Sequence, residues 1–337
     1  RFEVKVSIEK EEVAHRTLTL RALFRSFPKG KVPDCYYDYL RGSITRETLF
    51  AHPDVPEESR VAAREARCAE LGITPHSRVD GWIRAALDGT KEWVLIGGPP
   101  CQAYSRAGRS RMRPGDAEKF EKDKRHFLYT EYLRIIKEFG PAVFVMENVK
   151  GILTSKHGGS PIFDRILGDL RDPGNGFKYR VRSFVVEGEQ LSPQDYLIES
   201  EKFGLPQARH RVILFGIRSD LAEAACKLLA QPRRFRLKEA GRQVSVRDAL
   251  AGLPSLRSRL SQEPDSREAW LSAVRESPDG LKGWDDPMRV AVELEMTRAV
   301  HAARINDSFG GRFLKQQVQL GIDMPKKLRD WIADPKL

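Results

Sequence analysis

The run Gly97-Gly98-Pro99-Pro100-Cys101-Gln102 constrains the fold of this chain more than any other feature. It directly follows Trp93-Val94-Leu95-Ile96, an apolar stretch that predicts a buried parallel strand. The strand therefore ends in a turn that two prolines stiffen, and a cysteine stands just beyond it. Because open α/β sheets place their chemistry at this edge, we expect Cys101 to act as a nucleophile.

Two further polar groups lie beside predicted strands. The apolar run 142–146 predicts a second buried strand, and Glu147-Asn148 follows it at once. Later in the chain, Gln207-Ala208-Arg209-His210-Arg211 directly precedes the predicted strand 212–217. Each group alone is a weak signal, since a glutamate after a strand is often only the neighbour of a helix N-terminus. Together, in this order on one α/β frame, the groups indicate one catalytic site.

Strands and helices alternate along the first two thirds of the chain. We expect strands at 2–8, 93–96, 142–146, 180–186 and 212–217, and helices at 11–26, 59–71, 125–138 and 161–171. This alternation predicts an α/β fold with a mostly parallel sheet and helices on both faces. After Arg218 the periodicity weakens, so we expect a boundary within 218–245 between a catalytic domain, 1–218, and a smaller irregular region, 219–337.

The formal net charge of +11 favours a polyanionic partner, of which nucleic acid is the common one; general solubility is the alternative. No run of about 18 apolar residues occurs, so we expect no membrane partner. None of the four cysteines has Cys-x-x-Cys spacing, so no metal site is expected. Their scatter predicts reduced thiols in the cytoplasm, and Cys68 and Cys226, in Ala-rich helical patterns, are expected in the core.

The three polar groups resemble motifs of the DNA cytosine-5 methyltransferases, which use S-adenosyl-L-methionine. Residues 97–108 resemble the nucleophile loop of that family, 145–151 its acidic motif, 203–212 its Gln-x-Arg-x-Arg segment and 244–254 the sequence that follows. The resemblance covers residues 2–255. Residues 256–337 correspond to the family only by position, where it keeps its target-recognition region.

The resemblance implies a Rossmann-like fold and an enzyme that methylates carbon 5 of cytosine in double-stranded DNA, as in restriction–modification systems. It also implies a monomer in the cytoplasm, associated with the nucleoid in a prokaryote. Two alternatives stay open. One is a non-catalytic DNA-binding remnant that cannot hold the cofactor. The other is methylation of transfer RNA, although the Cys-Phe-Thr signature of that branch does not occur.

The resemblance gives the polar residues their roles. Cys101 attacks carbon 6 of the cytosine as a thiolate, Glu147 hydrogen-bonds ring nitrogen 3, and Arg211 contacts the base carbonyl oxygen. Arg209 orients Glu147 or the loop, with a structural ion pair as the open alternative, and His210 is interpreted as a solvent-facing spacer. The other substrate-binding residues are Gln102, Ser105, Asn148, Gln207 and Arg109. Since these groups cannot reach a base inside a duplex, the cytosine must flip out.

The cofactor-binding residues implied by the resemblance are Glu9, for the ribose hydroxyls, Asp80, for the adenine, and Pro99 and Pro100, for the methionine side. Asp80-Gly81 could instead form a turn. The basic loop 106–124 closes over the DNA or is simply solvated. The family's opening Phe-x-Gly-x-Gly loop and closing Asn-containing segment have no match here, so we expect an internal fragment of a longer protein.

Overall fold

The chain divides into two compact units, Arg1–Pro33 with Glu47–Val246 and Asp34–Arg46 with Arg247–Leu337. The computed structural model describes residues 2–28, 30–99, 128–157, 160–188, 190–222, 236–250, 260, 264, 266–281 and 288–303. Within these ranges, no helix combines the length and the apolar character that crossing a bilayer requires. The assignment of catalysis to residues 1–218 and of target recognition to 219–337 stays a prediction.

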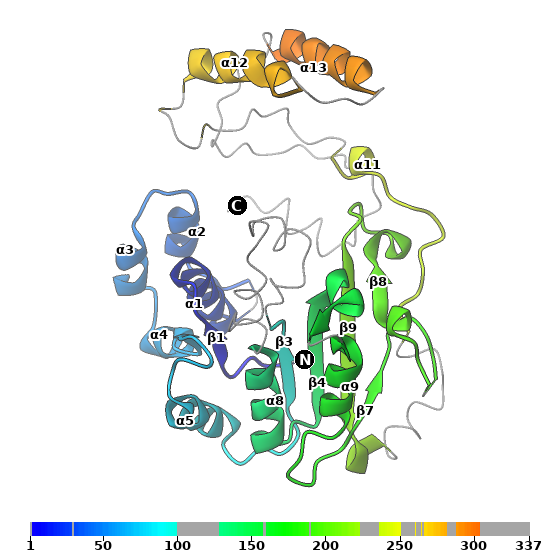
Figure 1. Cartoon of the computed structure of the whole chain (residues 1–337). Coiled ribbons are helices and arrows are strands. Elements are labelled where there is room, and N and C mark those ends of the chain that lie inside the picture. Colours follow the sequence, from blue (N-terminus) through cyan, green and yellow to red (C-terminus); the bar gives the residue numbers. More distant parts are fainter. Residues whose placement is uncertain are drawn as a thin grey trace. The chain divides into compact units, whose positions relative to one another are not determined.

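The first unit contains a five-stranded sheet (Figure 1). Its strands are β3 (Val94–Gly97), β4 (Val143–Val149), β7 (Tyr179–Arg182), β8 (Leu197–Glu199) and β9 (His210–Arg218). They pair in the order β3-β4-β9-β7, and β8 also pairs with β9. β3 and β4 are parallel, whereas β9 is antiparallel to β4, β7 and β8. Four of these strands therefore share one direction and β9 is reversed, which confirms the predicted α/β sheet of mostly parallel strands.

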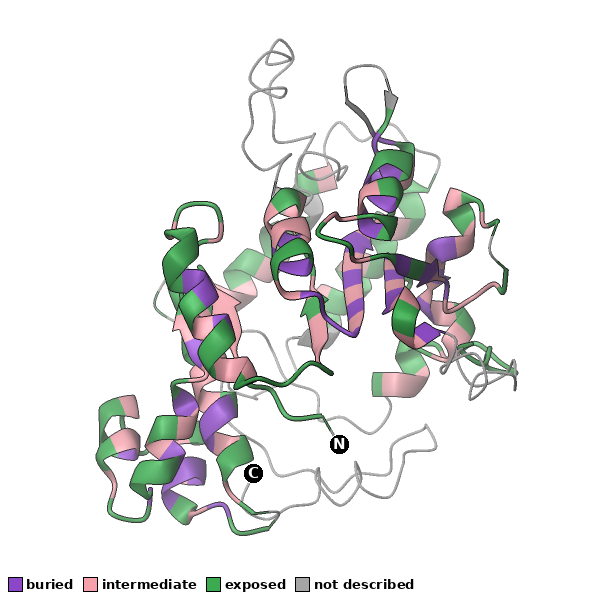
Figure 2. Cartoon of the chain, turned by 90° about the horizontal axis from the view of Figure 1, so that it is seen from below, coloured by how far each residue is buried: buried purple, intermediate pink, exposed green. Residues whose placement is uncertain are grey.

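Residues of β4 alternate between buried and half-buried, because successive side chains of a strand point to opposite faces. Phe144 and Met146 join the main hydrophobic core with apolar residues of α8 (Leu128–Phe139) and α9 (Ile162–Arg171). Figure 2 shows the buried residues gathered on the strands and on the helices beside them. The other face of the sheet carries Phe215, whose ring centroid lies 5.1 Å from that of Phe184.

Two short parallel strands, β1 (Ser7–Glu9) and β2 (Ala66–Cys68), form a second sheet in the same unit. The helix α1 (Glu12–Ser26) packs on this pair and on α4 (Glu57–Ala63). The helix α5 (His76–Leu87) buries its apolar face beside α8. The β1–β2 sheet and the helix layer of the main sheet are thus connected through an apolar cluster that includes Ile8 of β1 and Ile135 of α8.

The helix predicted at 59–71 is wrong in its second half. α4 ends at Ala63, and residues 66–68 pair with β1 instead. The Ala-rich composition favours a helix, but the pairing with a parallel strand overrides local propensity. Cys68, predicted in the core, consequently lies exposed at the end of β2. Cys226 lies outside the described residues.

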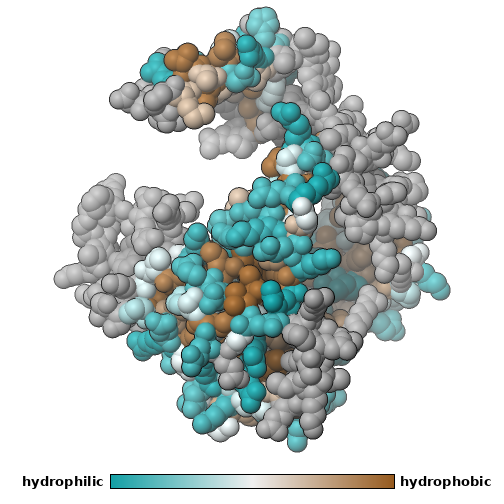
Figure 3. Space-filling view, turned by 90° about the vertical axis from the view of Figure 1, so that its right-hand side faces the viewer, coloured by the Kyte–Doolittle hydropathy of each residue, from teal (hydrophilic) through white to brown (hydrophobic). Residues whose placement is uncertain are grey.

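The remaining elements of the first unit are short and connect the larger ones. They are α3 (Arg46–Ala51), η2 (Lys150–Thr154), β5 (Lys156–His157), β6 (Ser160–Pro161), η3 (Pro193–Tyr196) and η4 (Ser200–Phe203). The second unit contains α2 (Asp34–Leu40), α11 (Val246–Leu250), α12 (Arg267–Glu276), η5 (Ser277–Leu281) and α13 (Arg289–Ala303). Hydrophobic surface is visible on this unit at the top of Figure 3, and Val290 and Leu294 of α13 are exposed.

Candidate active site

Glu147 and Arg211 meet because β4 and β9 pair in one particular antiparallel register. Val149 lies opposite Arg211, and Glu147 lies opposite Ile213. Since side chains two residues apart on a strand share a face, Glu147 and Arg211 are diagonal neighbours on the same face of the sheet. Nε of Arg211 lies 2.6 Å from Oε1 of Glu147. The predicted proximity of these two residues is therefore found in the structure.

The guanidinium of Arg211 is held on two sides. One Nη nitrogen donates a hydrogen bond of 2.8 Å to the carbonyl oxygen of His210. Nε is buried, but its N–H is not aligned on any acceptor among the described residues, so its contact with Glu147 is an ion pair without hydrogen-bond geometry. The pair keeps 24% of the Arg211 side chain and 42% of the Glu147 side chain exposed. A ligand can therefore reach both groups.

The turn after β3 passes close to the same carboxylate. A Cβ built on Gly98 would lie 3.1 Å from Oε2 of Glu147, so a side chain at residue 98 would require the carboxylate to shift by a few tenths of an ångström. Asn148 donates from Nδ2 to the carbonyl oxygen of Pro99 at 3.4 Å, and its Oδ1 accepts from the Val149 N–H at 2.9 Å. Asn148 is buried and lies on the face opposite Glu147, so it supports the backbone of the turn.

The structure describes the approach to the predicted nucleophile loop only as far as Pro99. Five of the predicted site residues lie outside the described residues: Pro100, Cys101, Gln102, Ser105 and Arg109. Their roles stay predictions. The described part of the turn directs the chain past Glu147 immediately before these residues.

Arg209 makes no contact with Glu147 among the described residues, and its predicted role toward the loop stays a prediction, whereas His210 differs from expectation. The side chain of Arg209 is exposed, and the ion pair with Glu147 is made by Arg211. The physical reason is that residue 209 precedes β9 and lies in a turn, whereas Arg211 lies inside the paired strand. The interpretation of His210 as a solvent-facing spacer is wrong: the ring is half-buried, and its Nε2 lies 2.8 Å from Oε1 of Glu201.

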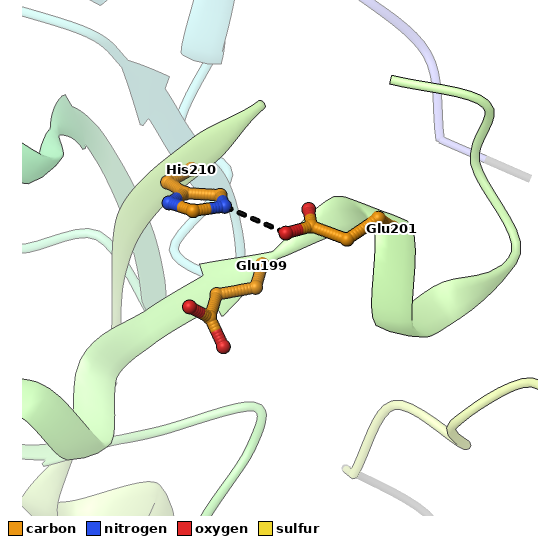
Figure 4. A group of neighbouring side chains, drawn as sticks. All are labelled: Glu199, Glu201 and His210. Carbon is orange, nitrogen blue, oxygen red and sulfur yellow. Dashed lines mark hydrogen bonds and ion pairs between the residues drawn. The ribbon is translucent and has the colours of Figure 1, made fainter. Parts of the chain in front are cut away.

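His210 belongs to a small cluster with Glu199 and Glu201 at the junction of β8, η4 and β9 (Figure 4). Glu199 also pairs with Lys202, and that hydrogen bond lowers the pKa of the Glu199 carboxyl. The backbone N–H of Glu201 and then the His210 ring lower the pKa of the Glu201 carboxyl. These residue types could bind a divalent cation, but partners within the protein already engage all three of them.

Gln207 contributes backbone rather than side-chain contacts within the described residues. Its side chain is exposed, while its carbonyl oxygen accepts hydrogen bonds from the Arg209 N–H at 2.8 Å and from the Ser200 hydroxyl at 2.7 Å. Ser200 was missed from the sequence because a serine in a polar stretch carries no signal of burial. The glycine four residues later, which marks the end of η4, hints only that the chain turns there.

Glu9 and Asp80 are not brought together with Glu147 by any described contact. Glu9 ends β1, is half-buried, and accepts a hydrogen bond of 2.9 Å from the Glu11 N–H. Asp80 lies inside α5, so the alternative that Asp80-Gly81 forms a turn is wrong. Its carboxylate is buried and lies 2.8 Å from a guanidinium nitrogen of Arg134, which gives it a structural ion pair. Both cofactor roles stay predictions.

Residues 86–280 match the family described as C-5 cytosine-specific DNA methylase. The chain is 32% identical over 235 residues to the type II methyltransferase M.Bpa9945I of Bacillus paralicheniformis, which covers 65% of this chain and 50% of that protein. It is 36% identical to M.BspRI of Lysinibacillus sphaericus, over 38% of this chain and 24% of the relative. It is 32% identical to M.MthTI of Methanothermobacter thermautotrophicus, over 52% and 42% respectively. The chain thus spans half or less of these relatives.

Proposed function

The chain belongs to the C-5 cytosine-specific DNA methylase family, and we propose that it transfers a methyl group from S-adenosyl-L-methionine to carbon 5 of a cytosine in double-stranded DNA. The observation that supports this most directly is the contact between Glu147 and Arg211 at the sheet edge where Gly98 and Pro99 leave β3. One acidic and one basic side chain there suit the two polar edges of a single pyrimidine.

The proposed reaction begins when the Cys101 thiolate adds to carbon 6 of the ring. Addition moves an electron pair toward carbon 5, and Glu147, when it carries a proton, hydrogen-bonds nitrogen 3 and offsets the developing negative charge. Arg211 donates to the carbonyl oxygen of the base. Carbon 5 would then form its bond to the methyl group as the methyl–sulfur bond of the donor breaks, and that electron pair would leave on sulfur as a neutral thioether. A base removes the carbon-5 proton, and the electron pair of that C–H bond expels the Cys101 thiolate, which restores the aromatic ring.

The ion pair between Glu147 and Arg211 also has a role in the proposed reaction before the base binds. Arg211 neutralises the Glu147 carboxylate while the site holds no base, so that neither charge is left without a partner in a partly buried place. An incoming cytosine replaces that contact with its own polar atoms. Asn148, fixed below the sheet surface, holds the Pro99 carbonyl and so limits movement of the turn that leads to Cys101.

S-adenosyl-L-methionine supplies an electrophilic methyl sulfonium when it is bound. Glu9 fits a role toward the ribose, because it ends the parallel strand β1, remains half-buried and accepts a hydrogen bond from the Glu11 N–H. Pro99 fits the methionine side, since it lies just past the end of β3. Asp80 is less suited to contact the adenine, because its carboxylate already forms an ion pair with Arg134. We therefore propose Glu9 and Pro99, with Pro100, as the cofactor contacts.

Double-stranded DNA is the proposed partner, and the positive net charge supports it. The target cytosine has to leave the stack, which costs a few kcal/mol. Arg109 and the basic loop 106–124 are proposed to contact phosphates beside the extruded base. Contacts with base edges determine which DNA sequence is recognised, and we propose that residues 219–337 make these contacts.

Covalent trapping tests this function. The substrate is a long DNA duplex in which 5-fluorocytosine replaces the cytosines of one strand. Its length allows it to contain the unknown recognition sequence. Fluorine at carbon 5 blocks the step that eliminates the Cys101 thiolate. Mixed with S-adenosyl-L-methionine and the full protein, this duplex is expected to give a protein–DNA adduct that survives denaturing electrophoresis. Cys101→Ala should give none, whereas Cys68→Ala, which removes an exposed thiol at the end of β2, should retain it.

An adduct that persists in Cys101→Ala would show that a different residue is the nucleophile. The absence of any adduct with the unchanged protein would contradict the proposed reaction. Calorimetric titration with S-adenosyl-L-methionine then identifies the non-catalytic alternative, since a DNA-binding remnant binds DNA but not the cofactor.

A further inference from the structure

A serine outside the predicted motifs contacts the backbone of the turn 207–209. Ser200 is 7% exposed, and its Oγ lies 2.7 Å from the carbonyl oxygen of Gln207 and 2.7 Å from that of Arg209. The same oxygen accepts a hydrogen bond of 2.9 Å from the Arg209 N–H. One buried hydroxyl therefore contacts three backbone groups of the turn that leads into Arg211.

Strand pairing fixes both ends of this loop. β8 pairs with the beginning of β9, so that Ile198 lies opposite Arg211. Ser200 begins η4 directly after β8, and the chain reverses at Gly204, whose φ of +79° favours glycine. The segment 200–209 is therefore a loop with a paired base, and the Ser200 hydroxyl lies inside it.

A second contact supports the same turn from η4. Glu201, the residue after Ser200, is hydrogen-bonded to His210, the first residue of β9 (Figure 4). His210 in turn offers its carbonyl oxygen to the guanidinium of Arg211 at 2.8 Å. A chain of contacts therefore connects η4 to the side chain that meets Glu147.

Removal of the Ser200 hydroxyl has a local consequence. The Arg209 N–H loses one of its two acceptors and keeps only the Gln207 carbonyl oxygen, and the two carbonyl oxygens of the turn lose the buried hydroxyl donor that they share. The turn is then expected to shift toward solvent to recover these hydrogen bonds. Because Arg211 is two residues beyond Arg209, such a shift moves its guanidinium relative to Glu147. A displacement of about 1 Å at a catalytic group is enough to slow a reaction strongly.

We propose that Ser200 is a positioning residue for the reaction: its hydroxyl fixes the backbone path that delivers Arg211 to Glu147 and, through them, to the base. This inference rests on the proposed function. Ser200 touches no reacting atom in the proposal. Its effect should therefore appear in the rate of methyl transfer and only weakly in the affinity for DNA.

The test compares Ser200→Ala with Ser183→Ala in the full protein. Ser183 is a matched control: it is 6% exposed, its hydroxyl donates to the Asp195 carbonyl oxygen at 2.5 Å, and it accepts from the N–H groups of Val185 and Val186. Both variants lose a buried hydroxyl with three backbone contacts, so both should be destabilised to a similar extent. Only Ser200 contacts the turn before Arg211.

Methyl transfer is measured with radiolabelled S-adenosyl-L-methionine and unmethylated plasmid DNA. We expect Ser200→Ala to lower kcat about tenfold or more, with KM for DNA within about threefold of the unchanged protein. Ser183→Ala should keep kcat within about twofold. Ser200→Thr, which retains the hydroxyl, should recover most of the rate. Equal losses in the two alanine variants, or no loss in Ser200→Ala, would overturn the proposal.

Amide hydrogen exchange gives a readout that needs no activity. In Ser200→Ala the Arg209 amide should exchange about tenfold faster or more, while the Leu214 amide inside β9 stays unchanged. If the unchanged protein transfers no methyl group, the proposed function fails, and exchange at Arg209 alone decides whether Ser200 holds the turn. Unchanged exchange at Arg209 would rule that role out.

Discussion

Glu147 lies near the carboxyl end of β4, a strand whose alternate residues are buried, yet it keeps 42% of its own side chain exposed. Partly exposed ion pairs contribute about 0–1 kcal/mol to stability, so the contact with Arg211 adds little to folding. The Glu147 carboxylate contributes little to stability and lies near the carboxyl end of a strand, where a ligand can reach it. It is therefore suited to binding a substrate. The chemical role of this residue and its structural role can therefore be separated by experiment.

Glu147→Gln is expected to slow methyl transfer about a hundredfold or more, because an amide cannot supply the proton that offsets charge at nitrogen 3. The free energy of unfolding should change by less than about 1 kcal/mol. Single-turnover methyl transfer and urea unfolding measure the two effects. A variant that loses affinity for DNA but keeps its rate would argue against the general-acid role.

Gly98→Ala is expected to reduce methyl transfer about tenfold, because its Cβ would lie 3.1 Å from Oε2 of Glu147 and displace the carboxylate. Gly97→Ala is the matched control, since its Cβ would lie 2.6 Å from the buried ring of Tyr132. That clash should instead cost about 1–3 kcal/mol of stability. Kinetics and urea unfolding of both variants check this division. A normal rate in Gly98→Ala would mean that the carboxylate moves freely.

The sequence was sufficient to predict that Glu147 and Arg211 share a site, because both follow or begin strands of an α/β pattern. It was not sufficient to assign the partner of Glu147, since that depends on the register of β4 against β9. Arg209 and Arg211 are indistinguishable by composition, and only pairing tells which one lies in the strand. Asp80 was assigned to the adenine by the family resemblance, which cannot reveal the Arg134 side chain beside it.

At the scale of elements, Gly216 of β9 allows the ring of Phe144 to pack closely against the main sheet. Gly216 lies opposite Phe144 on one side and Val181 on the other. The ring of Phe144 is fully buried and fills the space where a side chain on residue 216 would stand. A glycine in the middle of a strand normally weakens it, so its presence here reflects the close approach of this ring.

Gly216→Ala is expected to destabilise the protein by about 1–3 kcal/mol, because the new methyl group overlaps the Phe144 ring. Gly168→Ala in α9 provides the contrast, since a Cβ there meets nothing within 4 Å. That helical substitution should raise stability by about 0.5–1 kcal/mol. Urea unfolding of both proteins measures the difference. Similar stabilities would indicate that Phe144 repacks at little cost.

Element prediction succeeded where apolar residues repeat with a clear period. The helices α8 and α9 carry such repeats, and the strands β3, β4 and β9 contain uninterrupted apolar runs. It failed at 59–71, where alanines are compatible with either state and the partner strand β1 lies far away in the sequence. A parallel pairing of this kind leaves no local signature, because neither strand is joined to the other by a short turn.

At the scale of the whole molecule, buried tyrosines connect stability to alkaline pH. Burial raises the pKa of Tyr132 far above its usual value of 10.0, and its hydroxyl donates to the Val145 carbonyl oxygen at 2.9 Å. The folded protein therefore retains this proton where the unfolded chain releases it. The stabilisation is complete below about pH 10 and is lost progressively as the pH rises above that value.

Tyr132→Phe should therefore make the fall in unfolding free energy above pH 10 shallower, by up to about 1.4 kcal/mol per pH unit. Urea unfolding at pH 8 to 11 measures the slope for both proteins. The slope is the relevant quantity, because the variant also loses one hydrogen bond at every pH. Identical slopes would show that Tyr132 becomes accessible to solvent before the protein unfolds.

The reversed direction of β9 has a consequence for how such chains diversify. Because β9 runs against β4, its first residues meet the last residues of β4. Hydrogen bonds between the two strands hold the acid and the guanidinium in place. The lengths of surface connections between these strands can therefore change while the reactive pair stays together, provided that the loop 200–209 keeps its contacts with the start of β9.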